Sequence, residues 1–192
     1  MVKLVIFDFD DTLFFTTSVH AKSYSQAISE LLKIYVSDLM IEKEIKAGAV
    51  FPGLLSSFLP EISIDLAKEI HRRKSEIYME SSSAIRINNR IVDLLPDVSS
   101  KYFTAIWSNS SRLNIEMLLI KYHLSVFFDL IYSREDLKYL KPDIRSYIDL
   151  CAIFSTSLHE SLLVDDSNVN LETIRKSGAV GLLPANFHLS SF

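Results

Sequence analysis

Three aspartates and a threonine follow the first apolar run of the chain and could carry chemistry. The stretch VIFDFDDTLF places Asp8, Asp10, Asp11 and Thr12 directly after residues that favour burial. Carboxylates crowded together repel one another unless protons or a cation neutralise them. We therefore expect a functional site at this point of the fold.

Polar side chains follow three later apolar runs in the same way. They are Ser108 and Asn109 in TAIWSNSS, Lys141 in KYLKPD, and Asp165, Asp166 and Asn170 in LLVDDSNVN. Each residue alone is common in caps and turns. In open parallel sheets, however, ligands bind beyond the carboxyl ends of the strands, so these side chains are expected to converge in one crevice. Several carboxylates with a lysine and a hydroxyl predict a Mg²⁺ site that also takes a substrate phosphate.

The elements that must position these residues alternate between strands and helices. Apolar runs without polar alternation predict strands buried on both faces, and helical spacing with capping residues predicts helices between the later strands. The expected strands are 2–7, 103–107, 127–132, 162–164 and 179–183, and the expected helices are 113–120 after a Ser110-Ser111 cap, 144–152 and 171–177. This alternation predicts an α/β fold, a Rossmann-like parallel sheet flanked by helices.

The segment between the first two strands is too long for one crossover. Residues 16–88 contain helical patterns around 21–32 and 66–77 and are expected to form an inserted all-helical domain. The catalytic core would then comprise residues 1–15 and 89–192. The basic run 71–74 could steer an anion, but a solvated helix face is the preferred interpretation.

Composition excludes several classes of protein. The chain has 192 residues, 48% of them hydrophobic, and a net charge of −4, which suits a globular protein and argues against a nucleic-acid partner. No window is long and apolar enough for a signal peptide or a membrane span. The one cysteine, Cys151, cannot form an internal disulfide and fits a buried helix face, so a cytoplasmic location is the default expectation. The oligomeric state stays open, with a monomer as the default. The histidines lack metal-ligand spacing.

Four motifs in chain order resemble those of a known superfamily. DFDDT matches D-x-D-x-T, and WSNSS, LKPD and VDDSNVN match the second to fourth motifs of the haloacid dehalogenase-like phosphatases. The resemblance covers essentially the whole chain. The helical insertion resembles the C1 cap of the phosphoglycolate phosphatase and phosphomutase branch.

The resemblance implies a role for each motif residue. Asp8 would be the nucleophile that forms an aspartyl-phosphate, and Asp10 would be the general acid and then the general base. Lys141 would neutralise charge on Asp8 and the phosphate. The remaining expected roles are Mg²⁺ binding by Asp8, the Asp10 carbonyl, Asp166 and Asp165, phosphate binding by Ser108 and the Asn109 backbone, and orientation of the loop by Thr12.

Two positions depart from the family pattern. Asp11 stands where many members have glycine, although an acid is also familiar there. Asn170 stands where many members have a second metal-site aspartate, and it can still hydrogen-bond Lys141 or a metal-bound water.

The motifs favour a Mg²⁺-dependent phosphatase acting on a small phosphorylated metabolite under a cap that excludes water. A phosphomutase would use the same residues. A catalytically silent binding protein is disfavoured because Asp8, Asp10 and Lys141 are all retained. A dehalogenase needs neither a metal nor Asp10, and the resemblance disfavours a phosphonatase, which lacks the acid at that place.

Overall fold

The computed structural model describes residues 1–188 and divides the chain into two units. The core unit contains residues 1–14 and 87–192, and the insertion unit contains residues 15–86. The last residues of the expected core range, 189–192, lie outside the described part of the chain.

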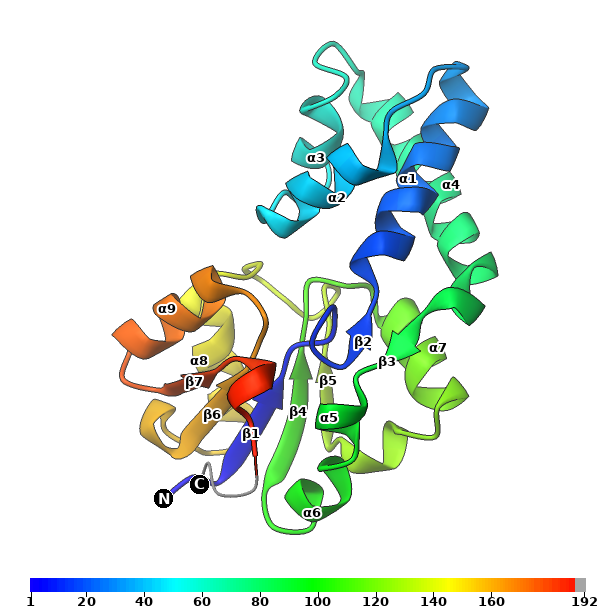
Figure 1. The fold of residues 1–192 in the computed structure, drawn as a ribbon. Helices are drawn as coiled ribbons and strands as arrows, with labels where there is room; N and C mark the ends of the chain where they lie inside the picture. The colour runs from blue at the N-terminus through cyan, green and yellow to red at the C-terminus, as the bar shows by residue number, and fades with distance from the viewer. Residues whose placement is uncertain (189–192) are drawn as a thin grey trace. The chain divides into compact units, whose positions relative to one another are not determined.

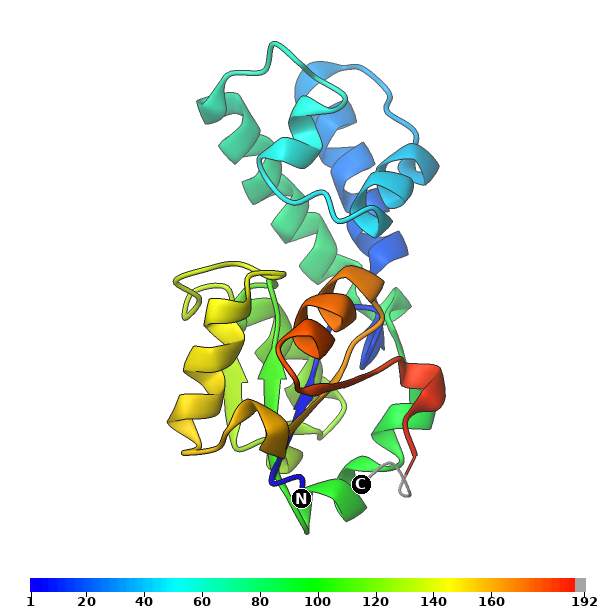
Figure 2. The same ribbon diagram turned by 90° about the vertical axis from the view of Figure 1, so that its left-hand side faces the viewer.

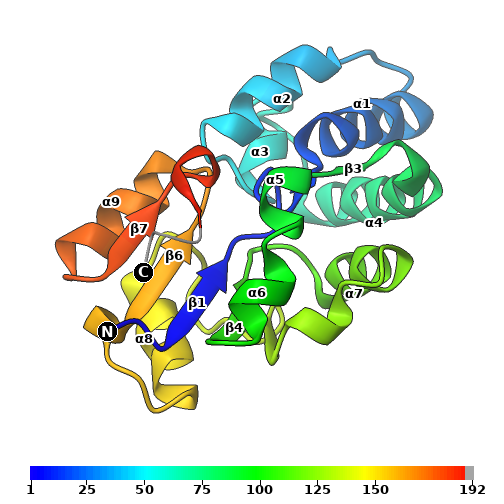
Figure 3. The ribbon, with the colours of Figure 1, turned by 60° about the horizontal axis from the view of Figure 1, so that its bottom comes forward.

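A five-stranded sheet forms the centre of the core unit (Figure 1). Its strand order is β5-β4-β1-β6-β7, visible in part along the sheet in Figure 3, and every neighbouring pair is parallel. The strands are β1 Leu4–Phe7, β4 Phe103–Trp107, β5 Leu130–Tyr132, β6 Ser161–Val164 and β7 Val180–Leu182. The predicted parallel α/β sheet is confirmed, and all its strands present their carboxyl ends at one edge.

The central strand β1 explains why the sheet is buried on both faces. All four of its residues, LVIF, are buried, and burial of each such side chain contributes roughly 1.5–3 kcal/mol. Leu4 and Ile6 point to one face, where they join the core cluster containing Trp107, Tyr147 and Leu171. Helices α8 Ile144–Ile153 and α9 Asn168–Lys176 therefore cover this face.

The opposite face of the sheet has its own cover. Phe7 packs edge-on against Phe128 and Phe187, at centroid distances of 6.1 and 5.5 Å. In the view of Figure 2, α8 (yellow) and the green segment with α5 and α6 lie on opposite sides of the sheet. The helices here are α5 Asn89–Val92, α6 Leu95–Ser99 and α7 Arg112–Lys121, and the single turns η2 Ser125–Phe127 and η4 Pro184–Asn186 contact them. A further turn, η3 Leu158–Glu160, precedes β6.

The insertion unit is built from helices. They are α1 Thr17–Leu32, α2 Asp38–Lys46, α3 Gly53–Ser56 and α4 Ile64–Glu80, followed by the turn η1 Ser82–Ala84. Ala21, Tyr24 and Ile28 on α1 share a buried cluster with Ile70 and Ile77 on α4. Short strands β2 Phe14–Phe15 and β3 Arg86–Ile87 pair where the chain passes between the units.

One part of the basic run on α4 differs from the expected solvated face. Lys74 is 5% exposed, and its ammonium lies 5.1 Å from the ring centroids of both Tyr24 and Tyr78. The expectation was wrong here because aromatic rings offer a cation an electrostatic partner inside the unit. No helix within residues 1–188 is both long and apolar enough to cross a membrane.

Candidate active site

The loop after β1 turns sharply and holds the first acidic motif at the sheet edge. The Asp8 N–H donates to the Val164 carbonyl at 2.9 Å, and the Asp11 N–H donates to the Phe14 carbonyl at 2.7 Å. Asp11 has φ 54°, in the left-handed region that favours glycine and that aspartate tolerates better than most residues. This conformation explains why either glycine or an acidic residue is expected at the position of Asp11.

Lys141 joins two motif carboxylates that are far apart in sequence. Its Nζ donates to Asp8 Oδ1 and to Asp165 Oδ2, each at 2.7 Å, and to the Trp107 carbonyl at 3.0 Å. The lysine side chain is 4% exposed, and Nζ lies 4.6 Å from the Trp107 ring centroid. Three strand ends and the loop before α8 therefore meet at one ammonium group.

Electrostatics at this cluster favour additional positive charge. Burial raises the pKa of the Asp8 carboxyl well above its ordinary value, and Lys141 opposes this effect. Burial acts to lower the pKa of Lys141, but Asp165 and Asp8 more than offset it, so the lysine pKa is raised. One ammonium thus faces several carboxylates, and a cation would stabilise their ionised forms.

Three carboxyl groups are arranged as a metal site would require. Asp8, Asp165 and Asp166 each offer an oxygen, and these atoms lie within 4.8 Å of one another. Asp166 is the exposed member, and partial loss of hydration, with repulsion from Asp165 and Asp11, raises its pKa to about 7. An all-oxygen set of this charge fits a hard divalent cation such as Mg²⁺.

Asp165 has a second set of donors besides Lys141. Its Oδ1 accepts from the Ser167 N–H at 2.8 Å, and Asn170 Nδ2 donates to both carboxylate oxygens at 3.1 and 2.9 Å. The structure therefore places Asn170 against Asp165, where an aspartate would add repulsion. The two adjacent aspartates differ in surroundings: Asp165 is fully buried and Asp166 reaches solvent.

The second motif is bonded to the third through backbone groups. Asn109 Nδ2 donates to the Lys141 carbonyl at 3.2 Å, and Asn109 Oδ1 accepts from the Lys141 N–H at 2.9 Å. Ser108 is buried, and its Oγ accepts from the Ser110 N–H at 3.0 Å. The loop after β4 is thereby fixed beside the lysine, and phosphate binding by Ser108 and Asn109 stays a prediction.

Thr12 connects the first motif to the fourth. Its buried Oγ1 accepts from the Asp166 N–H at 3.1 Å, and its carbonyl accepts from Asn88 Nδ2 at 2.9 Å. The threonine hydroxyl thus contacts the backbone of the loop that carries Asp165 and Asp166.

Two residues near the acids were missed from the sequence. Ser110 Oγ donates to Asp10 Oδ2 at 2.5 Å, although the Ser110-Ser111 pair was interpreted as a helix cap. Only Ser111 acts as the N-cap of α7, with its Oγ accepting from Asn114 N. Asn88 supports Thr12 across 76 positions of the chain. No local sequence signal distinguishes either residue, because both contacts depend on chain segments remote in sequence.

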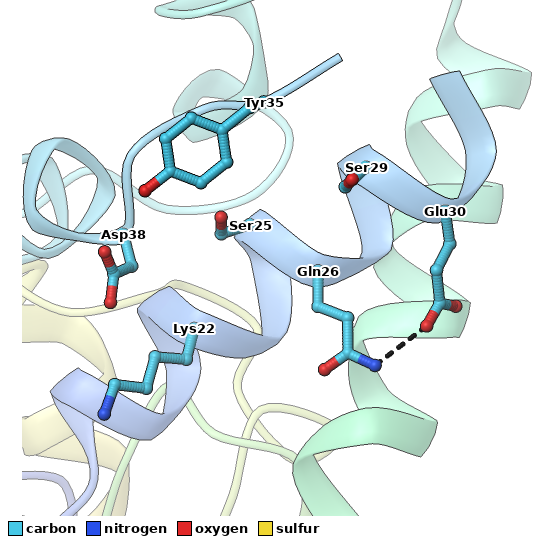
Figure 4. A pocket seen from close by; sticks show the side chains of 7 residues that line it. All are labelled: Lys22, Ser25, Gln26, Ser29, Glu30, Tyr35 and Asp38. Atoms are coloured by element: carbon cyan, nitrogen blue, oxygen red, sulfur yellow. Dashed lines mark hydrogen bonds between the residues drawn. The ribbon is translucent and has the colours of Figure 1, made fainter. Parts of the chain in front are cut away.

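The insertion unit contains an open hollow of about 350 Å³ on α1 and the segment that follows it (Figure 4). The residues lining it are Lys22, Ser25, Gln26, Ser29, Glu30, Tyr35 and Asp38. The residues that line it carry polar groups and charges of both signs, and they include none of the site residues expected from the motifs.

Solved structures resemble the chain over most of its length. CbbY from Rhodobacter sphaeroides in complex with phosphate has a TM-score of 0.81 at 18% identity, covering 95% of this chain and 86% of that one. A predicted phosphoglycolate phosphatase from Haemophilus somnus has a TM-score of 0.78 at 19% identity, covering 94% and 84%. A hydrolase from Pseudomonas syringae has a TM-score of 0.76 at 18% identity, covering 99% and 88%. At these identities the likeness establishes the fold.

A family model gives the stronger assignment. The model of the haloacid dehalogenase-like hydrolases matches residues 5–181, a range that contains all four motifs. The site described above contains the aspartates and the lysine of those motifs, brought together at one end of the sheet. The chain belongs to the haloacid dehalogenase-like hydrolase family.

Proposed function

We propose that the protein is a Mg²⁺-dependent phosphatase that hydrolyses a small phosphomonoester through an aspartyl-phosphate on Asp8. One observation carries the proposal: the oxygens of Asp8, Asp165 and Asp166 lie within 4.8 Å of one another, and Lys141 bonds two of these carboxyl groups. Carboxylates alone would repel a phosphate, so the positive charges of the lysine and of a metal are both needed for the phosphate to approach Asp8.

In the first half-reaction a carboxylate oxygen of Asp8 attacks phosphorus. The bond between phosphorus and the ester oxygen breaks, and its electron pair goes to that oxygen, which takes a proton from the Asp10 carboxyl. The products are the alcohol and the aspartyl-phosphate, and Asp10 is left ionised.

In the second half-reaction Asp10 takes a proton from a water molecule that attacks the same phosphorus. The bond between phosphorus and the Asp8 oxygen breaks, and its electron pair restores the carboxylate. Inorganic phosphate leaves, and Asp10 is again protonated, so the cycle closes without an external acid or base.

The remaining motif residues bind charge. Asp8, Asp165 and Asp166 side chains and the Asp10 carbonyl would hold Mg²⁺, which when bound neutralises charge on the phosphoryl oxygens. Lys141 neutralises negative charge on Asp8 and on the phosphate. Ser108 and the Asn109 N–H are proposed to hydrogen-bond the phosphate. Thr12 keeps the Asp166 backbone in place.

The proposed class of substrate rests on the family and on the resemblance of the insertion unit to a C1-type cap. We propose that the insertion unit is the C1-type cap and that it selects a small phosphorylated metabolite. CbbY has been seen with phosphate and, as a variant, with xylulose-1,5-bisphosphate. A phosphorylated sugar is therefore the first class to screen.

The deciding experiment compares the wild type with Asp8→Asn on 4-nitrophenyl phosphate and a panel of sugar phosphates, with Mg²⁺ or with a chelator. We expect Mg²⁺-dependent phosphate release by the wild type and none by Asp8→Asn. Asp97→Asn, the same change at an exposed position on α6, serves as the matched control and should behave as the wild type.

Three outcomes would overturn the proposal. Equal turnover by Asp8→Asn and the wild type would remove Asp8 as the nucleophile. Phosphoryl transfer between sugars, without incorporation of the oxygen isotope of labelled water into phosphate, would identify a phosphomutase. No turnover of any ester would favour a catalytically silent binding protein.

A further inference from the structure

Ser110 bonds the side chain of the proposed general acid. Its Oγ donates to Asp10 Oδ2 at 2.5 Å, across 100 positions of the sequence. A distance of 2.5 Å lies at the short end of the range for hydrogen bonds between a hydroxyl and an oxygen acceptor. The contact therefore restrains the Asp10 carboxyl more than an ordinary hydrogen bond would.

The backbone of Ser110 is itself held on both sides. Its N–H donates to Ser108 Oγ at 3.0 Å, and its carbonyl accepts from the Arg134 N–H at 3.0 Å. The next residue, Ser111, begins α7 as its N-cap. The hydroxyl is thus presented from a segment fixed to β4, to the loop after β5 and to a helix.

We infer that Ser110 is a positioning residue that orients Asp10 for proton transfer to the leaving group, an inference that rests on the proposed phosphatase function. The serine hydroxyl holds Oδ2 and so sets the direction in which the Asp10 carboxyl faces. Restricting the carboxyl to one orientation removes rotational freedom that proton transfer would otherwise have to overcome.

The inference predicts a dependence on the leaving group. Nitrophenolate is stable as an anion and needs little protonation, whereas phenolate is more basic and benefits more from an acid. The value of kcat/KM reports the steps up to departure of this group, so it is independent of the later hydrolysis of the aspartyl-phosphate. 4-Nitrophenyl phosphate and phenyl phosphate are also similar in size, so differences in binding largely cancel.

The experiment measures kcat/KM for both esters with the wild type and with Ser110→Ala, Ser110→Thr and Ser111→Ala. In Ser110→Ala we expect about a tenfold loss for phenyl phosphate, part of the 10²–10⁴ that a general acid contributes, and about twofold or less for 4-nitrophenyl phosphate. Ser110→Thr keeps the hydroxyl and should restore the wild-type ratio. Ser111→Ala removes the neighbouring cap and should leave the ratio unchanged.

The outcomes separate this inference from the proposed function. Equal losses for the two esters in Ser110→Ala, with the protein still folded by circular dichroism, would reduce Ser110 to a structural role while the phosphatase assignment stands. Failure of Ser110→Thr to restore the ratio would also overturn it. A wild type that hydrolyses neither ester nor any sugar phosphate would remove both the proposed function and this inference.

Discussion

Lys141 Nζ and Asp8 Oδ1 lie 2.7 Å apart, although 133 residues separate them in the chain. The same ammonium bonds Asp165, and both carboxyl groups are buried. The contact is therefore a three-member cluster in which one ammonium is shared by two carboxyl groups. The lysine stabilises the two buried carboxyl groups in the folded protein, and a metal would supply the positive charge that one ammonium does not.

Replacing Lys141 should affect stability and activity together. Lys141→Met leaves Asp8 and Asp165 buried without their cation, so we expect the free energy of unfolding to fall by about 3–5 kcal/mol in the presence of a chelator. Phosphatase activity should fall by more than about a hundredfold, the loss that removal of a charge-stabilising donor produces. Urea denaturation and a Mg²⁺ assay measure the two effects.

Lys138 provides the matched control for this substitution. It is exposed in the same loop, with its ammonium over the Tyr139 ring. Lys138→Met should change the free energy of unfolding by less than about 0.5 kcal/mol, as expected for a surface site. Similar effects of the two substitutions would contradict the shared-cation interpretation.

The two adjacent aspartates should respond differently to removal of charge. Asp165→Ala removes one of the two carboxyl partners of Lys141 and the acceptor of the Ser167 N–H and of the Asn170 amide, so we expect the free energy of unfolding to fall by about 3 kcal/mol or more. Asp166→Asn should leave the metal-free protein at least as stable near pH 8. The pKa of Asp166 is raised in the folded protein, so its ionisation opposes folding above that pKa.

Metal binding distinguishes the same pair. Asp166→Asn should weaken Mg²⁺ binding, measured by calorimetry, while the protein unfolds at or above the wild-type urea concentration. If Asp166→Asn instead destabilised the metal-free protein as much as Asp165→Ala, the interpretation that Asp165 supports the fold besides offering an oxygen to the metal, whereas Asp166 does not support the fold, would be wrong.

Mg²⁺ affinity should depend on pH near neutrality. The pKa of Asp166 is about 7, so protons compete with the metal for its carboxyl below that pH. We expect weaker binding at about pH 6 than at about pH 8, with proton release on binding at the lower pH. Calorimetry in two buffers of different ionisation enthalpy measures the released protons. Asp166→Asn should lose most of the dependence of Mg²⁺ affinity on pH. The same Mg²⁺ affinity of the wild type at both pH values would contradict the prediction.

Asn170 should be intolerant of a negative charge when no metal is bound. Asn170→Asp replaces an amide that donates to both Asp165 oxygens by a carboxylate that repels them. We expect lower stability in chelator and a larger gain in melting temperature on adding Mg²⁺ than in the wild type. Asn168→Asp, at the exposed first residue of α9, adds the same charge without that contact and is the control. Equal behaviour of the two variants would show that the Asn170 contact is unimportant.

The sequence predicted the sheet well because buried strands have a local signature. The run at 103–107 became β4 with the same bounds, whereas the run at 127–132 was shortened to β5 Leu130–Tyr132 by the turn η2 Ser125–Phe127. The short helices α5 and α6 were not predicted. A segment of four or five residues is too short to show helical periodicity.

The site was predicted to the level of its motifs and no further. Asp8, Asp165, Asp166 and Lys141 were expected together because parallel strands end at one edge of a sheet. The bond from Ser110 to Asp10 and the bond from Asn170 to Asp165 could not be expected. A serine or an asparagine has the same local appearance whether it caps a helix or bonds a catalytic acid.

The sequence alone determined the family, the order of strands along the chain, and the residues that carry charge at the strand ends. Apolar runs and motif spacing are properties of neighbouring residues, so they can be identified without knowing the fold. The tertiary structure decided which carboxylate is buried, which reaches solvent, and which donor each one accepts from. Those properties depend on desolvation and on contacts between residues a hundred or more positions apart, such as Asp8 with Lys141 and Asp10 with Ser110.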